Sequence, residues 1–300
     1  MLKISWSPIY FHPLPQGHRF PMEKYNLLPE QLLYEGTVSQ FNFFEPTLIE
    51  EKWITKTHDP DYFGKLKNLS LSKSEIRKTG FPLSQELIDR EITILSGSVQ
   101  ASLFALEYGI AMNIAGGTHH AFSGRGEGFC LLNDIAISAN YLLENALAKK
   151  ILVVDLDVHQ GNGTAEIFKN QKQVFTFSMH GASNYPMHKE KSDLDIGLPD
   201  HTDDINYIKT LRNSLQPILD NFQPDFIIYQ CGVDVLATDK LGRLGLSIAG
   251  CKERDQIVLT LAKESGIPIL CCMGGGYSEK ISHIIEAHAN TYRLAQDIFF

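Results

Sequence analysis

The chain has 300 residues, of which 43% are hydrophobic and 21% are charged, so there is enough apolar sequence to bury a complete core. Its formal net charge of −8 offers no basic surface, and direct nucleic-acid binding is therefore not expected. No apolar run approaches the roughly 18 residues that would cross a bilayer, and the N-terminal residues lack the pattern of an export signal, so no membrane segment is expected.

The five cysteines indicate the compartment in which the protein occurs. Their number is odd, none of them forms a C-x-x-C pair, and a chain of this length does not need disulfides to hold a core. A reducing compartment is the simplest environment for such a set. We therefore expect a cytoplasmic protein.

The first 80 residues begin with a candidate strand at 2–6. Residues from about 21 to 80 are richer in charge and show helical periodicity without a convincing strand. No linker, low-complexity tract or repeat separates them from the remainder. We expect these residues to pack as helices on the same domain, so that residues 1–300 form a single domain.

From about residue 84, long helical patterns alternate with short apolar, β-branched runs, which is typical of βαβ units and a parallel sheet. Five strands are predicted in this part, at 110–116, 150–157, 173–180, 225–234 and 267–275. Helical patterns lie between and after them, at 131–148, 203–222, 253–266 and 278–299. The predicted fold class is α/β, a single-domain, three-layer α/β/α fold with a mainly parallel central sheet.

Polar residues gather where the predicted strands end. In an open α/β sheet, ligands bind beyond the carboxyl ends of the strands. Five separate segments deliver such residues: His119 with His120, then Asp155, Asp157 and His159, then Ser178 with His180, then Asp234, and finally the turn GGGY at 274–277. This convergence predicts a functional site at one edge of the sheet.

Asp157, His159 and Asp234 are the candidate metal ligands. Asp and His after a single strand could simply cap the next helix, but a second carboxylate from another strand completes a three-ligand set. Three protein ligands with an open position are the catalytic arrangement of zinc. Because the set is rich in oxygen, Fe²⁺ is also compatible with it.

The adjacent pair His119 and His120 provides a candidate general base. Two neighbouring histidines could be surface or packing residues, but these lie at the predicted site, where a neutral imidazole can accept a proton from water. Asp155 is too far along the strand to be a comfortable fourth ligand with Asp157. It suits a role in orienting one of the two imidazoles.

Tyr277 follows three glycines and could donate a hydrogen bond to an oxygen that gains negative charge. A glycine-rich turn after a strand also fits a phosphate loop. The sequence has neither a G-x-x-x-x-G-K-[ST] motif nor a G-x-G-x-x-G motif with its acidic partner, and the phosphate reading is therefore disfavoured.

These residues stand in motifs that resemble the zinc-dependent histone deacetylase family, within the arginase/deacetylase superfamily. The motifs occur in the family order and cover nearly the whole chain: "HPLPQGHRFPMEKY" (12–25), "GGTHHAFSGRGEGFCLLNDIAI" (116–137), "DLDVHQGNGTAEIF" (155–168), "GVDVLATDKLGRLGLS" (232–247) and "GGGY" (274–277). The first and third of them are most similar to the class IV deacetylases and their bacterial relatives. The resemblance implies a single deacetylase-like catalytic domain.

The resemblance also implies roles for individual residues. Zn²⁺ would be bound by Asp157, His159 and Asp234, with His119 and His120 as the paired histidines and Tyr277 as the hydroxyl that polarises the scissile carbonyl. A structural K⁺ would lie near Asp155, Asp157, His159, Ser178 and Met179. Phe129, Tyr185 and Gly275 would line an acyl-lysine channel, and Arg19 would lie in an internal cavity below the metal. For Phe129 and Tyr185, ordinary aromatic packing is the alternative.

Two positions depart from the wider superfamily. Many deacetylases carry an aspartate where this chain has Asn162, which cannot stabilise a protonated His120 by charge, so we expect His120 to have a lowered pKa and to remain a neutral base at pH 7. The two-metal arginases need a carboxylate two residues before Asp234, and this chain has Gly232 there. One catalytic metal is therefore expected.

The reaction predicted from this set is metal-dependent hydrolysis of an acyl-lysine in a protein or peptide, with an acetyl or longer acyl group. A small acylated amine, such as an acetylpolyamine, is the alternative substrate. A non-catalytic protein that binds acyl-lysine is a third reading, disfavoured because every candidate ligand, histidine and tyrosine is present. The motifs carry no information on oligomeric state.

Overall fold

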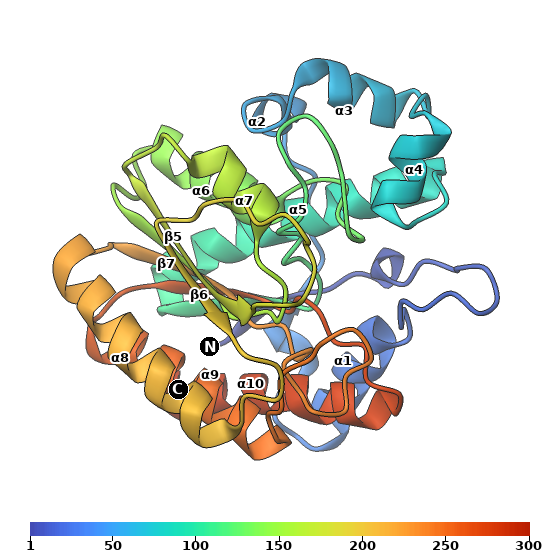
Figure 1. The fold of residues 1–300 in the computed structure, drawn as a ribbon. Coiled ribbons are helices and arrows are strands. Elements are labelled where there is room, and N and C mark those ends of the chain that lie inside the picture. Colours follow the sequence, from blue (N-terminus) through green and yellow to red (C-terminus); the bar gives the residue numbers. More distant parts are fainter.

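The computed structural model describes residues 1–300 and places one eight-stranded sheet at the centre of the molecule (Figure 1). The strand order is β2-β1-β3-β8-β7-β4-β5-β6, and every neighbouring pair is parallel. The strands are β1 (Lys3–Ser5), β2 (Phe43–Phe44), β3 (Ile110–Asn113), β4 (Ile151–Asp155), β5 (Val174–Gly181), β6 (Leu194–Leu198), β7 (Phe226–Gln230) and β8 (Ile269–Cys272).

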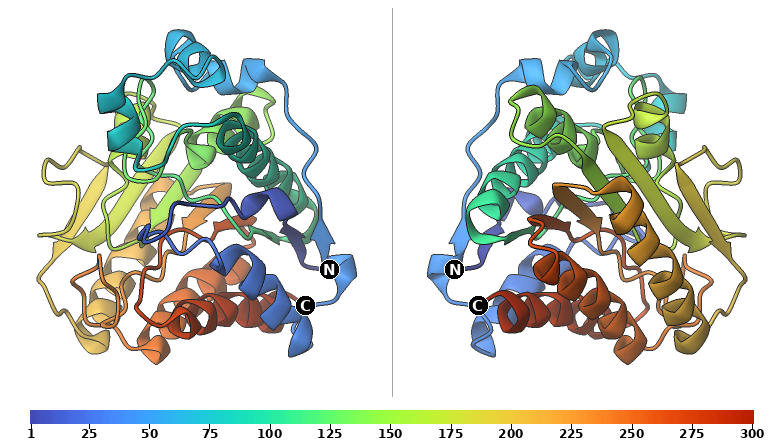
Figure 2. Two further views of the ribbon diagram at one scale, coloured as in Figure 1. Left: turned by 90° about the vertical axis from the view of Figure 1, so that its right-hand side faces the viewer. Right: turned by 90° about the vertical axis from the view of Figure 1, so that its left-hand side faces the viewer.

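Helices cover both faces of the sheet, which confirms the predicted three-layer α/β/α class (Figure 2). One layer contains α5 (Gln85–Tyr108), α6 (Asp134–Glu144) and α7 (Asn162–Phe168), and the short helices α2 (Glu51–Thr55), α3 (Pro60–Lys67) and α4 (Lys73–Thr79) lie beyond it. The opposite layer contains α1 (Lys24–Tyr34), α8 (Asp204–Phe222), α9 (Ile248–Glu264) and α10 (Ile281–Phe299). None of these helices is long and apolar enough to cross a membrane.

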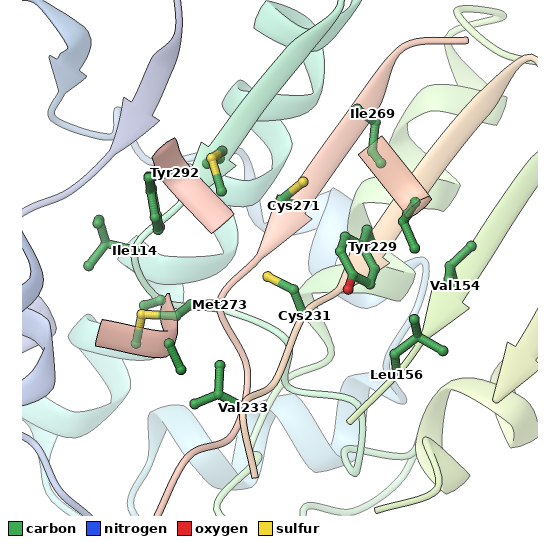
Figure 3. Close-up of a cluster of buried hydrophobic side chains, with 14 of the residues drawn as sticks. Ile114, Val154, Leu156, Tyr229, Cys231, Val233, Ile269, Cys271, Met273 and Tyr292 are labelled. Carbon is green, nitrogen blue, oxygen red and sulfur yellow. The ribbon is translucent and has the colours of Figure 1, made fainter. Parts of the chain in front are cut away.

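Successive residues of the central strands pack into two different cores. Along β4, Ile151 and Val153 belong to a cluster under α5 and α6, whereas Leu152 and Val154 belong to the larger cluster on the other face. Figure 3 shows part of the larger cluster, including Val154. Because both faces are covered, the strands read as continuous apolar runs rather than as an alternation. All five cysteines are buried and unpaired, and four of them, Cys231, Cys251, Cys271 and Cys272, belong to these cores.

The inner strands β3, β8, β7 and β4 end at one level, which positions the site, whereas β5 continues to Gly181. Asp155 of β4 lies opposite Ser178 of β5 and Gln230 of β7, and Gln230 lies opposite Cys272 of β8. The chain segments that follow these residues therefore leave the same edge of the sheet. Except for β5, the observed strands are shorter than the predicted ones. Buried apolar side chains such as Leu156 continue beyond the last ladder pair, so the apolar run does not mark where the strand ends.

Two strands were not predicted. Contrary to the expectation of no strand in 21–80, Phe43–Phe44 forms a two-residue strand beside β1. Leu194–Leu198 forms the opposite edge strand, in which intermediate and exposed residues alternate up to the buried Leu198. An edge strand paired on one side and partly open to solvent lacks the apolar run that marks the buried strands.

Candidate metal centre

The three predicted metal ligands lie together just beyond the carboxyl edge of the sheet. Asp157 and His159 follow β4, and Asp234 follows β7. Each offers a ligand atom within 4.8 Å of the others, and all three residues are buried. His159 Nδ1 lies 3.0 Å from Asp157 Oδ1 and 3.1 Å from Asp234 Oδ2. The arrangement brings two carboxylates and one imidazole around a single point.

The electrostatics of this set fit a divalent cation. Burial alone would lower the pKa of His159, but hydrogen bonds and charge from Asp157 and Asp234 outweigh it and raise that pKa to about 10. Burial and the charge of Asp157 raise the pKa of Asp234 to about 7. Without a metal, the two buried carboxylates thus depend on protons for compensation, because an unpaired buried charge is costly. A metal ion can replace those protons.

Glycines make room for the ligand carboxylates. A Cβ at Gly232 would collide with Asp157 Oδ2, and a Cβ at Gly275 would collide with Asp234 Oδ2. The Gly275 amide instead donates to Asp157 Oδ2 at 3.1 Å. Since Gly232 stands where a further carboxylate would be needed and no other such cluster occurs in the molecule, the structure offers ligands for one metal.

The two adjacent histidines have different partners. His119 Nδ1 lies 2.7 Å from Asp155 Oδ2, and His120 Nδ1 lies 2.6 Å from Asn162 Oδ1. Burial would lower the pKa of His119, but the charges of Asp155 and Asp157 raise it to about 9. For His120, burial and then the charges of neighbouring histidines hold the pKa well below its usual value. One ring thus favours the charged form and the other the neutral form.

We expect Asn162→Asp to move the acidic limb of the kcat/KM profile to higher pH by about 1 unit or more. As the expected general base, His120 would act only when neutral, so activity should fall as pH drops through its pKa. A carboxylate at 162 would stabilise the protonated ring and raise that pKa. The pH–rate profiles of both proteins, measured with saturating metal, check this, and an unchanged acidic limb would show that Asn162 does not tune His120.

Tyr277 borders the same cavity as the histidine pair. Its backbone N–H donates to Asp239 Oδ2 at 2.6 Å, and the preceding Gly274 carbonyl accepts from Lys24 Nζ at 3.0 Å. The Tyr277 ring packs 5.9 Å from the ring of Phe129. The glycine turn is thus held from two sides, and the ring of Tyr277 borders the cavity that Asp157 and His159 also line.

An outer pocket of about 240 Å³ shares five lining residues with this cavity and includes the exposed side chains of Arg19 and Tyr185. It is bordered by aromatic, histidine and cationic side chains: Arg19, Lys78, His120, Phe129, His159, Tyr185, Leu241 and Tyr277, together with Gly128. Phe129 and Tyr185 both lie on its wall, and the Tyr185 hydroxyl donates to Glu127 Oε2 at 2.8 Å. Gly275 lines the inner cavity instead of this outer pocket.

The expected position of Arg19 is wrong. Its side chain is exposed at the outer pocket, with the guanidinium 5.2 Å from the centre of the Phe129 ring. The cations buried near the inner cavity are Lys24 and Arg90, which come from helices α1 and α5. Motif position alone does not fix which way a loop side chain points, and here the loop before α1 leaves Arg19 in solvent.

The residues expected near a structural K⁺ lie on two adjacent strand ends. Asp155, Asp157 and His159 are at the end of β4, whereas Ser178 and Met179 are on β5, with Asp155 opposite Ser178. All five are buried. Their proximity is compatible with the expected site, and the ion itself stays a prediction.

Gln230 and Asp239 are among the supporting residues that were not predicted from the sequence. Gln230 donates to the Gly117 carbonyl at 2.9 Å and reaches Asp157 Oδ2 at 3.4 Å. Asp239 accepts from the amides of Gly242 and Tyr277 and so holds the tyrosine loop. Gln230 could have been identified from the sequence, because it is the one amide side chain inside the apolar run 225–234. Asp239 could not have been identified, since nothing in the sequence distinguishes it from an ordinary loop residue.

The parallel α/β sheet and the buried Asp/His/Asp set, with a histidine pair beside it, define a metal-binding α/β protein of the kind that can activate water for hydrolysis. Comparison with known proteins gives the family. The model of the histone deacetylase domain matches residues 18–292. The chain belongs to the histone deacetylase domain family.

Relatives align over most of this chain. An uncharacterized protein of Picosynechococcus sp. is 40% identical over 99% of both chains. Histone deacetylase 2 of Arabidopsis thaliana is 28% identical over 95% of this chain and 76% of its own length, and human histone deacetylase 1 is 28% identical over 88% of this chain and 58% of its own. The crystal structure of the HDA15 HD domain shares the fold, with a TM-score of 0.80 at 20% identity, covering 96% of this chain and 89% of that one.

Proposed function

We propose that this protein is a zinc-dependent amidohydrolase that removes acetyl or longer acyl groups from acyl-lysine in proteins or peptides. The observation that carries the proposal is the meeting of Asp157, His159, His120 and Tyr277 around one cavity that opens to the surface. Within the family we place the chain with the class IV-like deacetylases, on its N-terminal and "DLDVHQGNG" motifs. We further propose that residues 1–300 act as one catalytic domain in the cytoplasm.

Asp157, His159 and Asp234 would hold the metal, with Zn²⁺ as the proposed ion, Fe²⁺ also compatible, and K⁺ as a structural ion near β4 and β5. When bound, the catalytic ion supplies Lewis-acid polarisation of the substrate carbonyl and lowers the pKa of water. The residues of the chain do the rest of the chemistry.

His120 is the proposed general base, because burial keeps its pKa low and its Nδ1 is held by Asn162. After taking a proton from water, the same imidazole can donate it to the departing amine. His119, held by Asp155, places positive charge beside the reacting centre. The Tyr277 hydroxyl would donate a hydrogen bond to the carbonyl oxygen as negative charge grows on it.

The rim of the pocket favours acyl-lysine over the alternative of an acetylpolyamine. Arg19 and Lys78 both line the opening. Their positive charges repel a polycationic chain and accept a neutral or acidic peptide. Leu241, an apolar side chain, lies at the same opening and offers a polyamine ammonium no partner.

The test is a substrate panel on protein reconstituted with Zn²⁺ or Fe²⁺. We expect acetyl-lysine or myristoyl-lysine peptides to be turned over with a kcat/KM at least about tenfold above that of acetylspermidine, the size of effect that one or two like charges produce. Metal-free protein serves as the control. Turnover of the polyamine alone would replace the substrate assignment, and no turnover of any substrate by metal-loaded protein would leave only the reading as a non-catalytic acyl-lysine binder.

A further inference from the structure

The sheet does not fix the spacing of the two carboxylate ligands. The last ladder pair between β4 and β7 is Asp155 with Gln230, and the last backbone bond between the two segments runs from Leu156 N to Gln230 O at 3.2 Å. Asp157 follows this point directly, whereas Asp234 comes four residues after Gln230. Beyond this bond, no backbone–backbone hydrogen bond links the two segments.

A buried arginine of helix α9 links the two segments. Arg254 lies on α9 and is fully buried. Its Nη1 donates to the Gly232 carbonyl at 2.6 Å and to the Leu156 carbonyl at 3.2 Å, and its Nη2 donates to the Cys231 carbonyl at 3.2 Å. One planar guanidinium thus binds both ligand-bearing segments. A rigid fork of donors suits this task, whereas the ammonium of lysine is a single point.

The guanidinium is itself anchored by a neighbouring carboxylate. Arg254 Nε donates to Asp255 Oδ1 at 2.8 Å, and both side chains are fully buried. Asp255 also accepts from the Tyr229 hydroxyl of β7 at 2.5 Å and from Thr291 Oγ1 of α10 at 2.6 Å. Figure 3 shows Tyr229 beside Leu156 and Cys231, where β4 and β7 end. The charge of Arg254 is therefore compensated, and its position is set by three elements.

We propose that Arg254 is a positioning residue of the metal centre, which sets the separation of Asp157 and Asp234 through the carbonyls of Leu156 and Gly232. It touches neither ligand. The other direct contacts between the segments run from Val158 N to Asp234 Oδ1 at 2.9 Å, from His159 Nδ1 to Asp234 Oδ2 at 3.1 Å and from Gln230 Nε2 to Asp157 Oδ2 at 3.4 Å. Each of them involves a ligand carboxylate itself and so does not place the backbone independently. This inference rests on the proposed metal-dependent function.

The experiment compares Arg254→Lys with Thr291→Val. Lysine keeps the buried charge but cannot hold three carbonyls in one plane, whereas valine removes one bond to Asp255 and leaves the carbonyl contacts intact. We expect Arg254→Lys to raise the dissociation constant for Zn²⁺ by about 10–100-fold, as loss of outer partners of a metal site commonly does, and to alter the visible absorption bands of bound Co²⁺. Thr291→Val should change neither by more than about twofold.

Circular dichroism establishes that each variant is folded before metal is added. Unchanged Zn²⁺ affinity and Co²⁺ bands in folded Arg254→Lys would overturn the assignment, as would equal losses in Thr291→Val. If Arg254→Lys does not fold, Arg254→Gln/Asp255→Asn replaces the ion pair with two neutral amides, and the same results are expected. If that variant does not fold either, Arg254 serves the whole fold and the assignment to the metal centre is wrong.

The wild-type titration separates this inference from the proposed function. Wild-type protein that binds Zn²⁺ but hydrolyses no acyl-lysine leaves the role of Arg254 standing and removes the proposed activity. Wild-type protein that binds no Zn²⁺ removes both. If the wild-type protein is active and Arg254→Lys binds Zn²⁺ as tightly as the wild type, only the positioning role of Arg254 is contradicted.

Discussion

Tyr277→Phe is expected to lower kcat by about 10²–10³-fold while leaving metal affinity unchanged. The size is that of losing one donor to an oxygen that gains charge in the transition state. The ring should keep its place, because its position depends on the backbone bond to Asp239 and on packing against Phe129. Steady-state kinetics on an acyl-lysine peptide, with Zn²⁺ saturating, measure the effect.

Tyr34→Phe is the matched control, because Tyr34 is 91% exposed on α1 and lies outside both pockets. Its turnover should equal that of the wild type. Near-normal kcat in Tyr277→Phe would remove the tyrosine from the role of oxyanion donor. A loss expressed only in KM would assign it to substrate binding.

His120→Ala is expected to reduce kcat by about 10²–10⁴-fold, the usual range for a general acid–base group. The residual activity should also lose its dependence on pH on the acidic side. Below the pKa of His120 the wild-type ring is protonated and inactive as a base, so the limb belongs to this group and should vanish with it. kcat, together with a kcat/KM profile that extends well below pH 6.5, tests both expectations.

His201→Asn provides the control, since His201 is an exposed loop residue outside both pockets and asparagine tolerates its positive φ of 62°. It should retain the wild-type profile. If His120→Ala keeps the acidic limb of the profile, another group titrates in that pH range. The buried pair His119 and Asp155 would then be the next candidate for that group.

The sequence predicted the centre of the site well because its residues sit directly after strands. Apolar runs located β4 and β7, and the end of each run placed Asp157 and Asp234 at one edge. Neither step required knowledge of how the helices pack. The prediction of two histidines beside these ligands followed from the same rule, applied to the segment after β3.

The burial of the charged residues that support the site could not be predicted from strand positions. Arg254 lies among other charged residues in an amphipathic helix, where a charged side chain is ordinarily expected to be exposed. Its hydrogen-bond partner Leu156 is 98 residues away in the chain. Lys24 is buried for a similar reason, through a contact with Gly274. Arg19 shows the opposite error, since a motif suggested burial and the loop left it in solvent. Burial of a charge depends on partners that only the tertiary structure supplies.

The strand order has a consequence for how the molecule is made. β8 is the last strand to be synthesised, yet it lies in the interior of the sheet, between β3 and β7. Without β8, the strand order leaves two groups, β2-β1-β3 and β7-β4-β5-β6, with no ladder between them, and each would have an open inner edge of the kind that can pair with other chains. Only when residues 269–272 insert are the halves joined, and the turn that carries Tyr277 arrives immediately afterwards. The strand that joins the two parts of the sheet thus leads directly into the turn that lines the candidate site.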